Sequence, residues 1–258
     1  MRLDIDDLGF SYDGGRSVID GLTLGYESPD ALCILGSNGT GKSTLLQCVI
    51  GAFKPTRGDV RIDGRPVGSF SARDLARRIS YIPQTHVPAF EYPVIDVVTM
   101  GRTSIIGRFS TPSAADEERA LEKLDFLGIA HLRDKPYTQI SGGERQLVMI
   151  ASALAQEPDV LVLDEPTAHL DFGNQSRFVK LVEQLCAEGM GVIMTTHFPD
   201  HALELGGTTA VMSGGRIAHV GPAREVVTAD NLRALYGIEI NVCTLGERLV
   251  CVPGPLEG

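Results

Sequence analysis

The order of apolar and polar residues along this chain of 258 residues predicts two kinds of β-strand. Residues 1–30 alternate apolar and polar side chains between glycine turns, which is typical of antiparallel strands. Residues 58–67 continue this period with an Asp-Gly turn at 63–64. Other apolar runs are continuous, as expected for strands of a parallel sheet that are buried on both faces. These runs lie at 31–35, 160–163, 191–196 and 208–212.

A helical pattern replaces the strands between about residues 86 and 150. From 116 to 127 the apolar residues recur at helical spacing, and prolines punctuate the flanking loops. The residues that share one helix face are Ala120, Leu121, Leu124 and Leu127. We therefore expect residues 86–150 to form a helical subdomain inserted into a core made of residues 1–85 and 151–258.

A glycine-rich loop, within ILGSNGTGKSTLL at 34–46, follows the first continuous run. It carries the full spacing Gly36-x-x-x-x-Gly41-Lys42-Ser43 between a strand-like and a helix-like segment. Glycines let successive N–H groups point at one anion, and the helix start adds its positive dipole end. Lys42 would reach the β- and γ-phosphates of a nucleoside triphosphate, and the Ser43 hydroxyl would bind Mg²⁺. The residues predicted to bind ATP here are Gly36, Ser37, Asn38, Gly39, Thr40, Gly41, Lys42, Ser43 and Thr44.

Two acidic residues follow the apolar run at 160–163. Asp164, at the tip of a buried strand, can hold Mg²⁺ through water opposite Ser43. Glu165 is placed to act as general base on the attacking water. With the strand patterns, these features predict an α/β fold: a P-loop NTPase core with a mainly parallel sheet, an N-terminal antiparallel β-subdomain and an inserted α-helical subdomain.

Composition narrows the class of protein further. A net charge of −10 argues against a general affinity for nucleic acid or anionic lipid. No signal peptide is indicated at the acidic N-terminus, and the apolar runs are far shorter than the ~18 residues that span a bilayer. We therefore expect a soluble intracellular chain. Its scattered cysteines should be buried, reduced thiols: Cys33, Cys48, Cys186, Cys243 and Cys251.

The stretch QISGGERQ at 139–146 indicates the family. Its Ser141 lies 23 residues before Asp164. With the phosphate-binding loop, this arrangement resembles the nucleotide-binding subunit of ATP-binding cassette (ABC) transporters, whose signature helix begins with a Leu-Ser-Gly-Gly-Gln-like motif. Ile140 and Glu144 are mild departures from that motif. The resemblance implies a second anion site at the start of this helix, formed by Ser141, Gly142, Gly143 and Glu144.

Four further motifs match the family in the expected order. Tyr12, in FSYDGG, matches the aromatic residue that stacks on adenine. Gln84, in YIPQ, matches the glutamine that touches Mg²⁺ and the attacking water and links the core to the helical subdomain. Asp171, which ends AHLD, matches the loop that crosses to the partner subunit, and His197 matches the switch histidine that contacts the γ-phosphate.

The resemblance thereby assigns roles to these residues. It implies Glu165, His197 and Gln84 as catalytic residues. Ser43, Gln84 and Asp164 would hold the Mg²⁺ that accompanies ATP. The remaining histidines have no ligand spacing, so we expect no protein-bound metal and a structural role for His169. These histidines are His86, His131, His201 and His219.

The resemblance also implies partners. In the family, two subunits pair head to tail, so that each ATP lies between one phosphate-binding loop and the other subunit's signature motif, in a two-fold dimer. We expect such a dimer to bind an integral-membrane permease dimer at the cytoplasmic face of the cell membrane. A substrate-binding protein would act indirectly, and no nucleic acid is expected.

Two other classes of protein are alternatives to an importer ATPase. A soluble ABC ATPase of DNA repair would need a coiled-coil arm, and the 55 residues between the glutamine loop and the signature are too few. A translation type would carry two cassettes, and this chain has one. A phosphotransferase with the same loop would not need ISGGE or the terminal histidine.

Within the importers, several stretches look like the metal-chelate group. They are RRISYIPQ, VVTMGR, DEPTAHLDFGNQ and LRALYGIEINV. That group carries ferric siderophores, haem, cobalamin or, in some members, molybdate and tungstate; a ferric chelate is our first choice here. The stretch after Gln84 carries the apolar and aromatic residues Val87, Phe90, Tyr92 and Val94 between prolines. They either pack the junction of the core and the helical subdomain or, in part, line a groove that receives a short permease helix.

Overall fold

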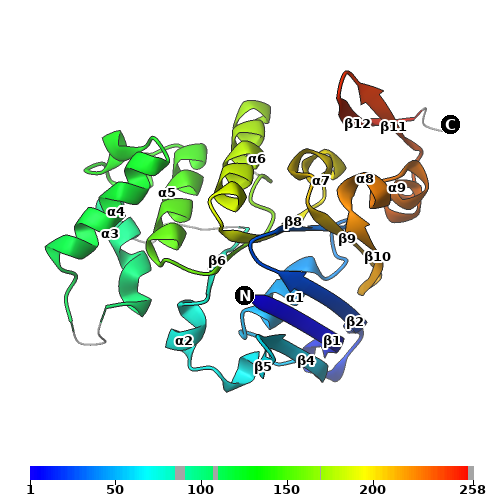
Figure 1. Ribbon diagram of the computed structural model, residues 1–258, viewed down its shortest axis with the longest axis horizontal. Helices are drawn as coiled ribbons and strands as arrows, with labels where there is room; N and C mark the ends of the chain where they lie inside the picture. Colours follow the sequence, from blue (N-terminus) through cyan, green and yellow to red (C-terminus); the bar gives the residue numbers. More distant parts are fainter. Residues whose placement is uncertain (85–90, 107–109, 169, 255–258) are drawn as a thin grey trace.

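The structure, a computed structural model, describes residues 1–84, 91–106, 110–168 and 170–254 (Figure 1). In these residues a six-stranded sheet has the order β10-β9-β3-β8-β7-β6. Strand β10 pairs antiparallel with β9 and the other pairs are parallel. All four predicted buried runs are strands of this sheet: β3 (Ala31–Leu35), β7 (Val160–Leu163), β8 (Gly191–Thr196) and β9 (Thr208–Ser213).

Two strands of this sheet were not predicted. In β6 (Ile79–Ile82) the polar Ser80 and the half-buried Tyr81 interrupt the apolar run. The edge strand β10 (Arg216–Pro222) is exposed over much of its length and carries no continuous apolar run. Neither sequence therefore looks like a strand that is buried on both faces.

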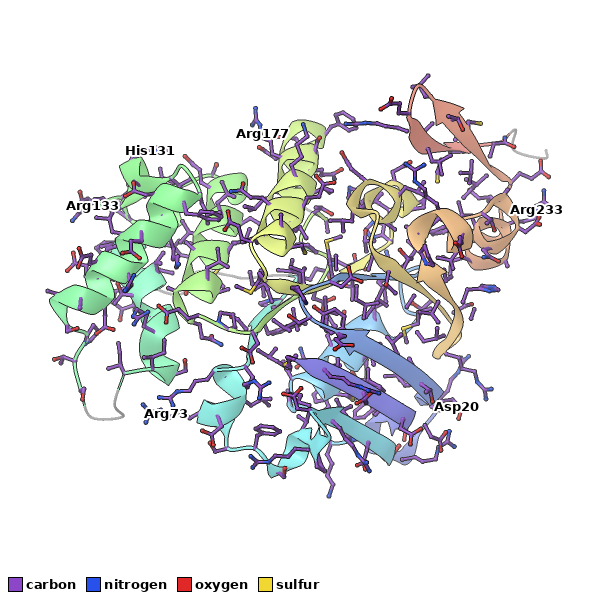
Figure 2. All side chains as sticks on the ribbon, viewed as in Figure 1. Asp20, Arg73, His131, Arg133, Arg177 and Arg233 are labelled. Atoms are coloured by element: carbon purple, nitrogen blue, oxygen red, sulfur yellow. The ribbon has the colours of Figure 1, made fainter. Side chains whose placement is uncertain are left out.

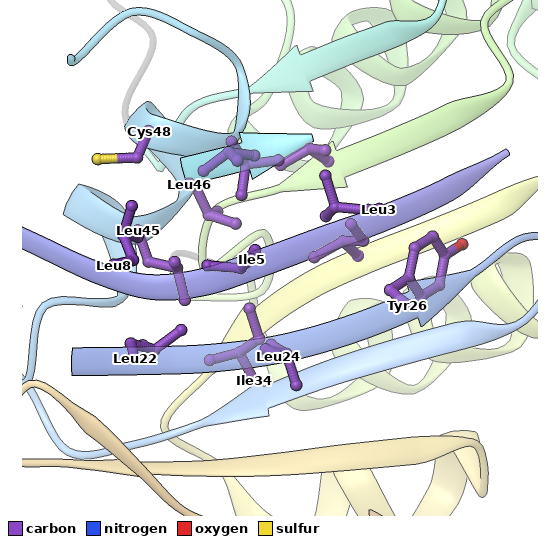
Figure 3. Close-up of a cluster of buried hydrophobic side chains, with 14 of the residues drawn as sticks. Leu3, Ile5, Leu8, Leu22, Leu24, Tyr26, Ile34, Leu45, Leu46 and Cys48 are labelled. Carbon is purple, nitrogen blue, oxygen red and sulfur yellow. The ribbon is translucent and has the colours of Figure 1, made fainter. Parts of the chain in front are cut away.

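The predicted antiparallel strands form a second sheet, with the order β2-β1-β4-β5. Its strands are β1 (Arg2–Ser11), β2 (Ser17–Glu27), β4 (Arg57–Ile62) and β5 (Arg65–Pro66). The turn between β4 and β5 places Asp63 and Gly64 at positive φ (50° and 77°), as a two-residue hairpin turn requires. The apolar face of this sheet packs on helix α1 (Lys42–Val49) and on Ile34 of β3 (Figure 3).

The two faces of the central sheet carry different layers (Figure 1). Helix α1 and the antiparallel sheet lie on one face, and α6 (Phe172–Ala187) and α7 (Pro199–Leu205) lie on the other. This follows from strand geometry, because successive side chains of β3 point to opposite faces. Ile34 joins the first core and Leu35 the second.

The helical segment lies at one end of the long axis (Figure 1). It contains α3 (Val94–Met100), α4 (Ala114–Phe126) and α5 (Gly142–Ala155), which share a third apolar core. The helix predicted for 116–127 is α4, which begins with a capping box between Ser113 and Asp116. Helix α5 continues to Ala155, past the boundary expected at residue 150.

Short elements complete the described chain. They are α2 (Ala72–Ala76), α8 (Ala223–Val226), α9 (Ala229–Tyr236), and the 3₁₀ turns η1 (Tyr12–Gly14), η2 (Val67–Ser69), η3 (Gly101–Ser104), η4 (Ala130–Leu132) and η5 (Tyr137–Gln139). A C-terminal hairpin, β11 (Ile240–Leu245) and β12 (Arg248–Pro253), was not predicted. None of the helices in the described ranges is both long and apolar enough to cross a bilayer.

Two arginine side chains, Arg73 in α2 and Arg77 directly after it, connect the core to the helical segment. Arg73 donates hydrogen bonds to the carbonyl oxygens of Ser104 (2.9 Å), Ile105 (2.9 Å) and Ile106 (3.1 Å). Arg77 donates to the Ser104 carbonyl oxygen at 3.2 Å. Figure 2 shows Arg73 extending from α2 toward the helices. Of the four residues after Gln84 that were expected to line a groove, Val87 and Phe90 lie outside the described residues, as does His169. The prediction is wrong for Val94, which is fully buried in the core of the helical segment, while Tyr92 is exposed.

The cysteine prediction was wrong in part. Cys33 and Cys48 are buried thiols, but Cys186 and Cys251 are only half-buried and Cys243 is exposed. Cys243 and Cys251 belong to the C-terminal hairpin, where one face points to solvent, so a cysteine there need not be buried.

Gly101 explains why α3 and α5 approach so closely. A Cβ added to Gly101 would lie 2.0 Å from the Ser152 carbonyl oxygen of α5. We predict that Gly101→Ala lowers the thermal midpoint by about 6–12 °C, because forcing the helices apart should cost roughly 3 kcal/mol. The control is Gly68→Ala, whose added Cβ meets no atom within 4 Å and should have little effect. Equal midpoints for the two variants would contradict this account of the packing.

Candidate functional site

The glycine-rich loop connects β3 to α1 in a conformation that only glycines allow. Gly39 and Gly41 have φ values of 79° and 100°. At Gly36 a Cβ would lie 2.8 Å from the Met212 carbonyl oxygen. In the described part of the chain, no acceptor pairs with the backbone N–H groups of residues 37–44. Because unpaired N–H groups at a helix start attract anions, this loop has the properties of a phosphate site.

Lys42 is the first residue of α1 and is almost fully buried, with 4% of its side chain exposed. Its Nζ donates to the carbonyl oxygens of Gly36 (2.8 Å) and Ser37 (3.1 Å). It also forms an ion pair with Glu165 Oε1 at 2.9 Å. The loop therefore folds back over its own lysine, and the charge of that lysine is matched by the predicted base.

Glu165 joins Lys42 to His197. Its Oε2 lies 2.9 Å from His197 Nδ1, and its N–H donates to Thr195 Oγ1 at 2.8 Å. The backbone of Glu165 is in the left-handed region (φ 45°), a conformation that costs about 1 kcal/mol or more and is enriched at active sites. The residues around His197, 196–198, are called the switch segment below. The Tyr236 hydroxyl donates a hydrogen bond to the His197 carbonyl oxygen at 2.7 Å and so helps to hold this segment in place.

The protonation state of Glu165 depends on these partners. Burial alone would raise the pKa of this carboxyl. The hydrogen bond and charge of Lys42, together with His197, outweigh burial and hold the pKa of Glu165 below its usual value. Glu165 is therefore ionised at neutral pH.

Asp164 is held in place by two hydroxyl groups. Its Oδ1 accepts a hydrogen bond from Thr195 Oγ1 at 2.8 Å, and its Oδ2 accepts from the Tyr81 hydroxyl at 3.3 Å. Burial, with the Asp164 charge beside it, raises the pKa of Tyr81, so this hydroxyl keeps its proton. Gln47 donates to the Tyr81 oxygen at 2.9 Å.

The three side chains predicted to hold Mg²⁺ carry oxygen donors of the kind that this ion prefers. A carboxylate from Asp164, the exposed hydroxyl of Ser43 and the exposed amide of Gln84, two residues after β6, are hard ligands. They are too few to enclose the ion without phosphate oxygens, as is usual for Mg²⁺ bound with a nucleotide. The described residues contain no cluster of three histidine, cysteine or acidic side chains that would hold a metal by itself.

Tyr12 lies beside the loop in η1. Its hydroxyl is 3.2 Å from Thr44 Oγ1. Its ring meets Phe10 edge-on, with 5.0 Å between ring centroids, and Phe53 in the same way at 5.8 Å. About half of the residue remains exposed (51%). An aromatic ring that is held by two aromatic neighbours and is still about half exposed is suited to stacking on a ligand.

The start of α5 forms a second cluster. Ser141 caps this helix by accepting from the Glu144 N–H at 3.3 Å, and Glu144 Oε2 accepts from the Ser141 N–H at 2.7 Å. The Ser141 hydrogen bonds lower the pKa of Glu144. Asp171 caps α6 and accepts from the backbone and side chain of Asn174, both at 2.8 Å. A Cβ at Gly143 would lie 3.3 Å from Asn174 Nδ2, so the signature residues and Asp171 are neighbours.

The structure therefore brings the sequence-predicted residues together in two groups. Lys42, Asp164, Glu165 and His197 lie at the carboxyl ends of β3, β7 and β8. The residues of the second group make no hydrogen bond or ion pair with the first within the described ranges. Ser141, Gly142, Gly143, Glu144 and Asp171 belong to this second group.

Sequence reasoning missed the residues that support the first group. Thr195 binds both Asp164 and the Glu165 N–H, and Tyr81 binds Asp164. A signal for Thr195 was available, because the two threonines that end GVIMTT are polar residues in a run that is otherwise apolar and buried. A buried hydroxyl there needs a partner, and the adjacent strand ends in acidic residues.

Comparison with known proteins agrees with this geometry. Residues 19–168 match the ABC transporter family. The chain is 34% identical to the molybdate import ATP-binding protein of Haemophilus influenzae, over 91% of this chain and 87% of that protein. It is 35% identical to the hemin import ATP-binding protein of Nocardia farcinica, over 88% and 78%. A solved structure, described as an inward-facing conformation of a metal-chelate type ABC transporter, superposes with a TM-score of 0.86 at 32% identity and covers 98% of both chains.

The Lys42–Glu165 pair predicts how stability responds to nucleotide. Glu165→Gln removes the charge opposite a buried ammonium, and we expect it to destabilise the free chain by about 2 kcal/mol, or roughly 4–8 °C in thermal midpoint. Added ATP should close this gap, because phosphates would supply negative charge to Lys42. Thermal unfolding with and without ATP measures both effects, with Glu118→Gln on the exposed face of α4 as the control.

The difference in thermal midpoint between wild type and Glu165→Gln should also depend on pH. Since the pKa of Glu165 is lowered in the folded state, its contribution is complete above the usual glutamate value of about 4.3. It is lost as the pH falls through the lower folded-state pKa. The midpoints of wild type and Glu165→Gln should therefore converge in acid. A gap that is absent at neutral pH, or that persists unchanged in acid, would refute the assigned pairing.

Proposed function

The chain belongs to the ABC transporter family and is one of its ATPases, and we propose that it powers an importer whose membrane permease is a separate chain. The observation that carries this proposal is the buried connection from Lys42 through Glu165 to His197, beside a loop whose N–H groups are unpaired. It joins a phosphate site, a carboxylate base and a switch histidine within direct contact distance.

The contacts suggest how ATP would use these residues. Phosphates bound to the N–H groups of residues 37–44 would compete with Glu165 for Lys42. Loss of the lysine partner raises the pKa of Glu165 toward its usual range, which makes the carboxylate a better acceptor for the proton of an attacking water. His197 would keep Glu165 oriented through Oε2 and contact the γ-phosphate.

The remaining residues of the first group would position the nucleotide. Asp164, Ser43 and Gln84 would hold Mg²⁺, which when bound neutralises charge on the β- and γ-phosphates. Thr195 and Tyr81 fix Asp164 before the ion arrives. The half-exposed ring of Tyr12 would stack on adenine, and its hydroxyl would keep its hydrogen bond with Thr44 Oγ1.

We propose that the second group serves the ATP of a second copy of this chain. Ser141 and Asp171 are exposed, and among the described residues their side-chain hydrogen bonds stay within their own helix starts. A head-to-tail, two-fold dimer would bring Ser141 of one copy to the phosphates held by the other, and would form two equivalent sites.

The names of the relatives support an import role, and a metal chelate remains our proposal for the cargo. Proteins that resemble this chain are named for hemin and molybdate import, so a ferric chelate is the first candidate to test. The permease would bind at the cytoplasmic face of the membrane where the core meets the helical segment. A groove of about 720 Å³ lies there, between α2 and η3, with Met100 at its edge 49% exposed.

The central experiment is the activity of Glu165→Gln. The variant should bind ATP more tightly than wild type, because Lys42, Ser43 and the loop N–H groups are unchanged and the Glu165 charge no longer competes with phosphate for Lys42. Its turnover should fall by at least 10²-fold, since the base is lost. With ATP it should also remain a dimer on a sizing column, while wild type returns to monomer as ATP is consumed. Near-normal turnover would remove Glu165 from the role of base.

Mixing two inactive variants tests the shared site. Lys42→Ala should disable the site on its own chain, and Ser141→Arg should disable the site on the partner. A heterodimer of the two keeps one intact site, so the mixture should regain up to about a quarter of wild-type turnover.

The matched control mixes Lys42→Ala with Glu165→Gln. Both lesions then lie in the first group, each heterodimer site carries one of them, and no activity should return. Recovery in neither mixture would count against the head-to-tail arrangement.

A further inference from the structure

His201 is a buried histidine to which the proposed ATPase mechanism gives no task. It lies in α7, four residues after His197, and is 7% exposed. Its Nδ1 is 3.3 Å from Thr167 Oγ1 and 3.3 Å from Thr196 Oγ1. Both threonines are almost completely buried, so their hydroxyls depend on partners inside the protein.

The two hydroxyls belong to the two segments that the ATPase has to coordinate. Thr196 directly precedes His197, and its Oγ1 also accepts the Phe198 N–H at 3.0 Å. Thr196 therefore fixes the turn that carries the switch histidine.

Thr167 lies in the chain between Glu165, the proposed base, and Asp171, which ends the partner-crossing loop. Its carbonyl oxygen accepts from the Leu170 N–H at 3.1 Å and from Gln175 Nε2 at 3.2 Å. Gln175 also donates to the Leu170 carbonyl oxygen at 3.1 Å, immediately before Asp171. A shift of Thr167 would thus be passed on to Asp171.

The chemistry of the imidazole suits it to join these hydroxyls. Burial, opposed by the charge of Asp200 and assisted by His197, lowers the pKa of His201, so the ring is neutral and one nitrogen can accept. The Thr196 oxygen already accepts the Phe198 N–H, which leaves its own proton to donate to Nδ1. The ring also packs against Phe198, with 5.1 Å between ring centroids.

We propose that His201 is a positioning residue that ties the switch segment to the partner-crossing segment, so that His197 and Asp171 move together during the ATPase cycle. The proposal rests on the ATPase function argued above. His201 touches no atom of the nucleotide in this scheme; it acts through Thr196 and Thr167 on the geometry of hydrolysis, and therefore on kcat rather than on ATP binding.

Three substitutions separate positioning from packing. His201→Asn keeps a polar atom near the place of Nδ1, His201→Gln moves it to the place of Nε2, and His201→Leu keeps only bulk. We expect His201→Leu and His201→Gln to lower kcat about tenfold, with the KM for ATP within about twofold of wild type. His201→Asn should stay within about threefold of wild-type kcat.

Steady-state hydrolysis by the full-length chain, with thermal midpoints in parallel, measures these effects. The control is His219→Leu on the exposed strand β10, which should match wild type. Wild-type kcat in His201→Leu, or an equal loss in His201→Asn and His201→Leu, would overturn the proposal. If His201→Leu does not fold, Thr167→Val decides, since it removes one hydroxyl at nearly constant shape; an unchanged kcat in Thr167→Val would then overturn it.

Failure of the proposed function looks different in the same assay. If wild type itself hydrolyses no ATP, the ATPase assignment fails and the positioning role fails with it. If wild type hydrolyses ATP and the His201 variants match it, the ATPase function stands and only the positioning role is lost.

Discussion

A lysine ammonium with 4% of its side chain exposed has to find negative charge inside the protein, and Lys42 finds it on Glu165. The pair joins the helix after β3 to the turn after β7, and β8 lies between these two strands in the sheet. The parallel register pairs Leu35 with Thr196 and Leu163 with Met194, so that three carboxyl ends meet at one edge. A slip of one residue in either pair of strands would turn the side chains of one strand to the opposite face of the sheet. The charges of Lys42 and Glu165 would then be separated.

Contacts from three other residues of the protein hold Glu165, the proposed base, in place. Thr195 binds Asp164 and the Glu165 N–H together, and His197 binds the second oxygen of Glu165. A buried ionic network is tolerated only when its members are satisfied, and these contacts satisfy it. The same charges that hold this edge of the sheet together would be redirected by ATP, so stability and activity depend on one set of contacts.

The sequence predicted the parts of the molecule in which one pattern dominates. Continuous apolar runs located β3, β7, β8 and β9, and fixed spacings located the loop at Lys42 and the residues after β7. It did not predict β6, β10 or the C-terminal hairpin, whose mixed side chains match no single period. Supporting residues were missed for another reason. The contacts of Tyr81 and His201 depend on which strands and helices become neighbours, and a single sequence does not show this. For Thr195 the sequence held a signal, a polar residue in a buried run, but it did not identify the partners.

The identity of the cargo is absent from this chain for a physical reason. The roles that we propose for the side chains at the sheet edge are phosphate, metal and base chemistry, and none of this chemistry depends on what is transported. In the proposed importer, the permease would bind where the core meets the helical segment. There Arg73 and Arg77 donate to backbone carbonyl oxygens of Ser104, Ile105 and Ile106, not to their side chains. Hydrogen bonds to backbone carbonyl oxygens can form with any side chain at positions 104–106. The side chains on this surface can therefore differ between proteins with different permeases, while the residues at the carboxyl ends of the strands stay the same. One cassette architecture can then serve relatives that are named for importing molybdate and hemin.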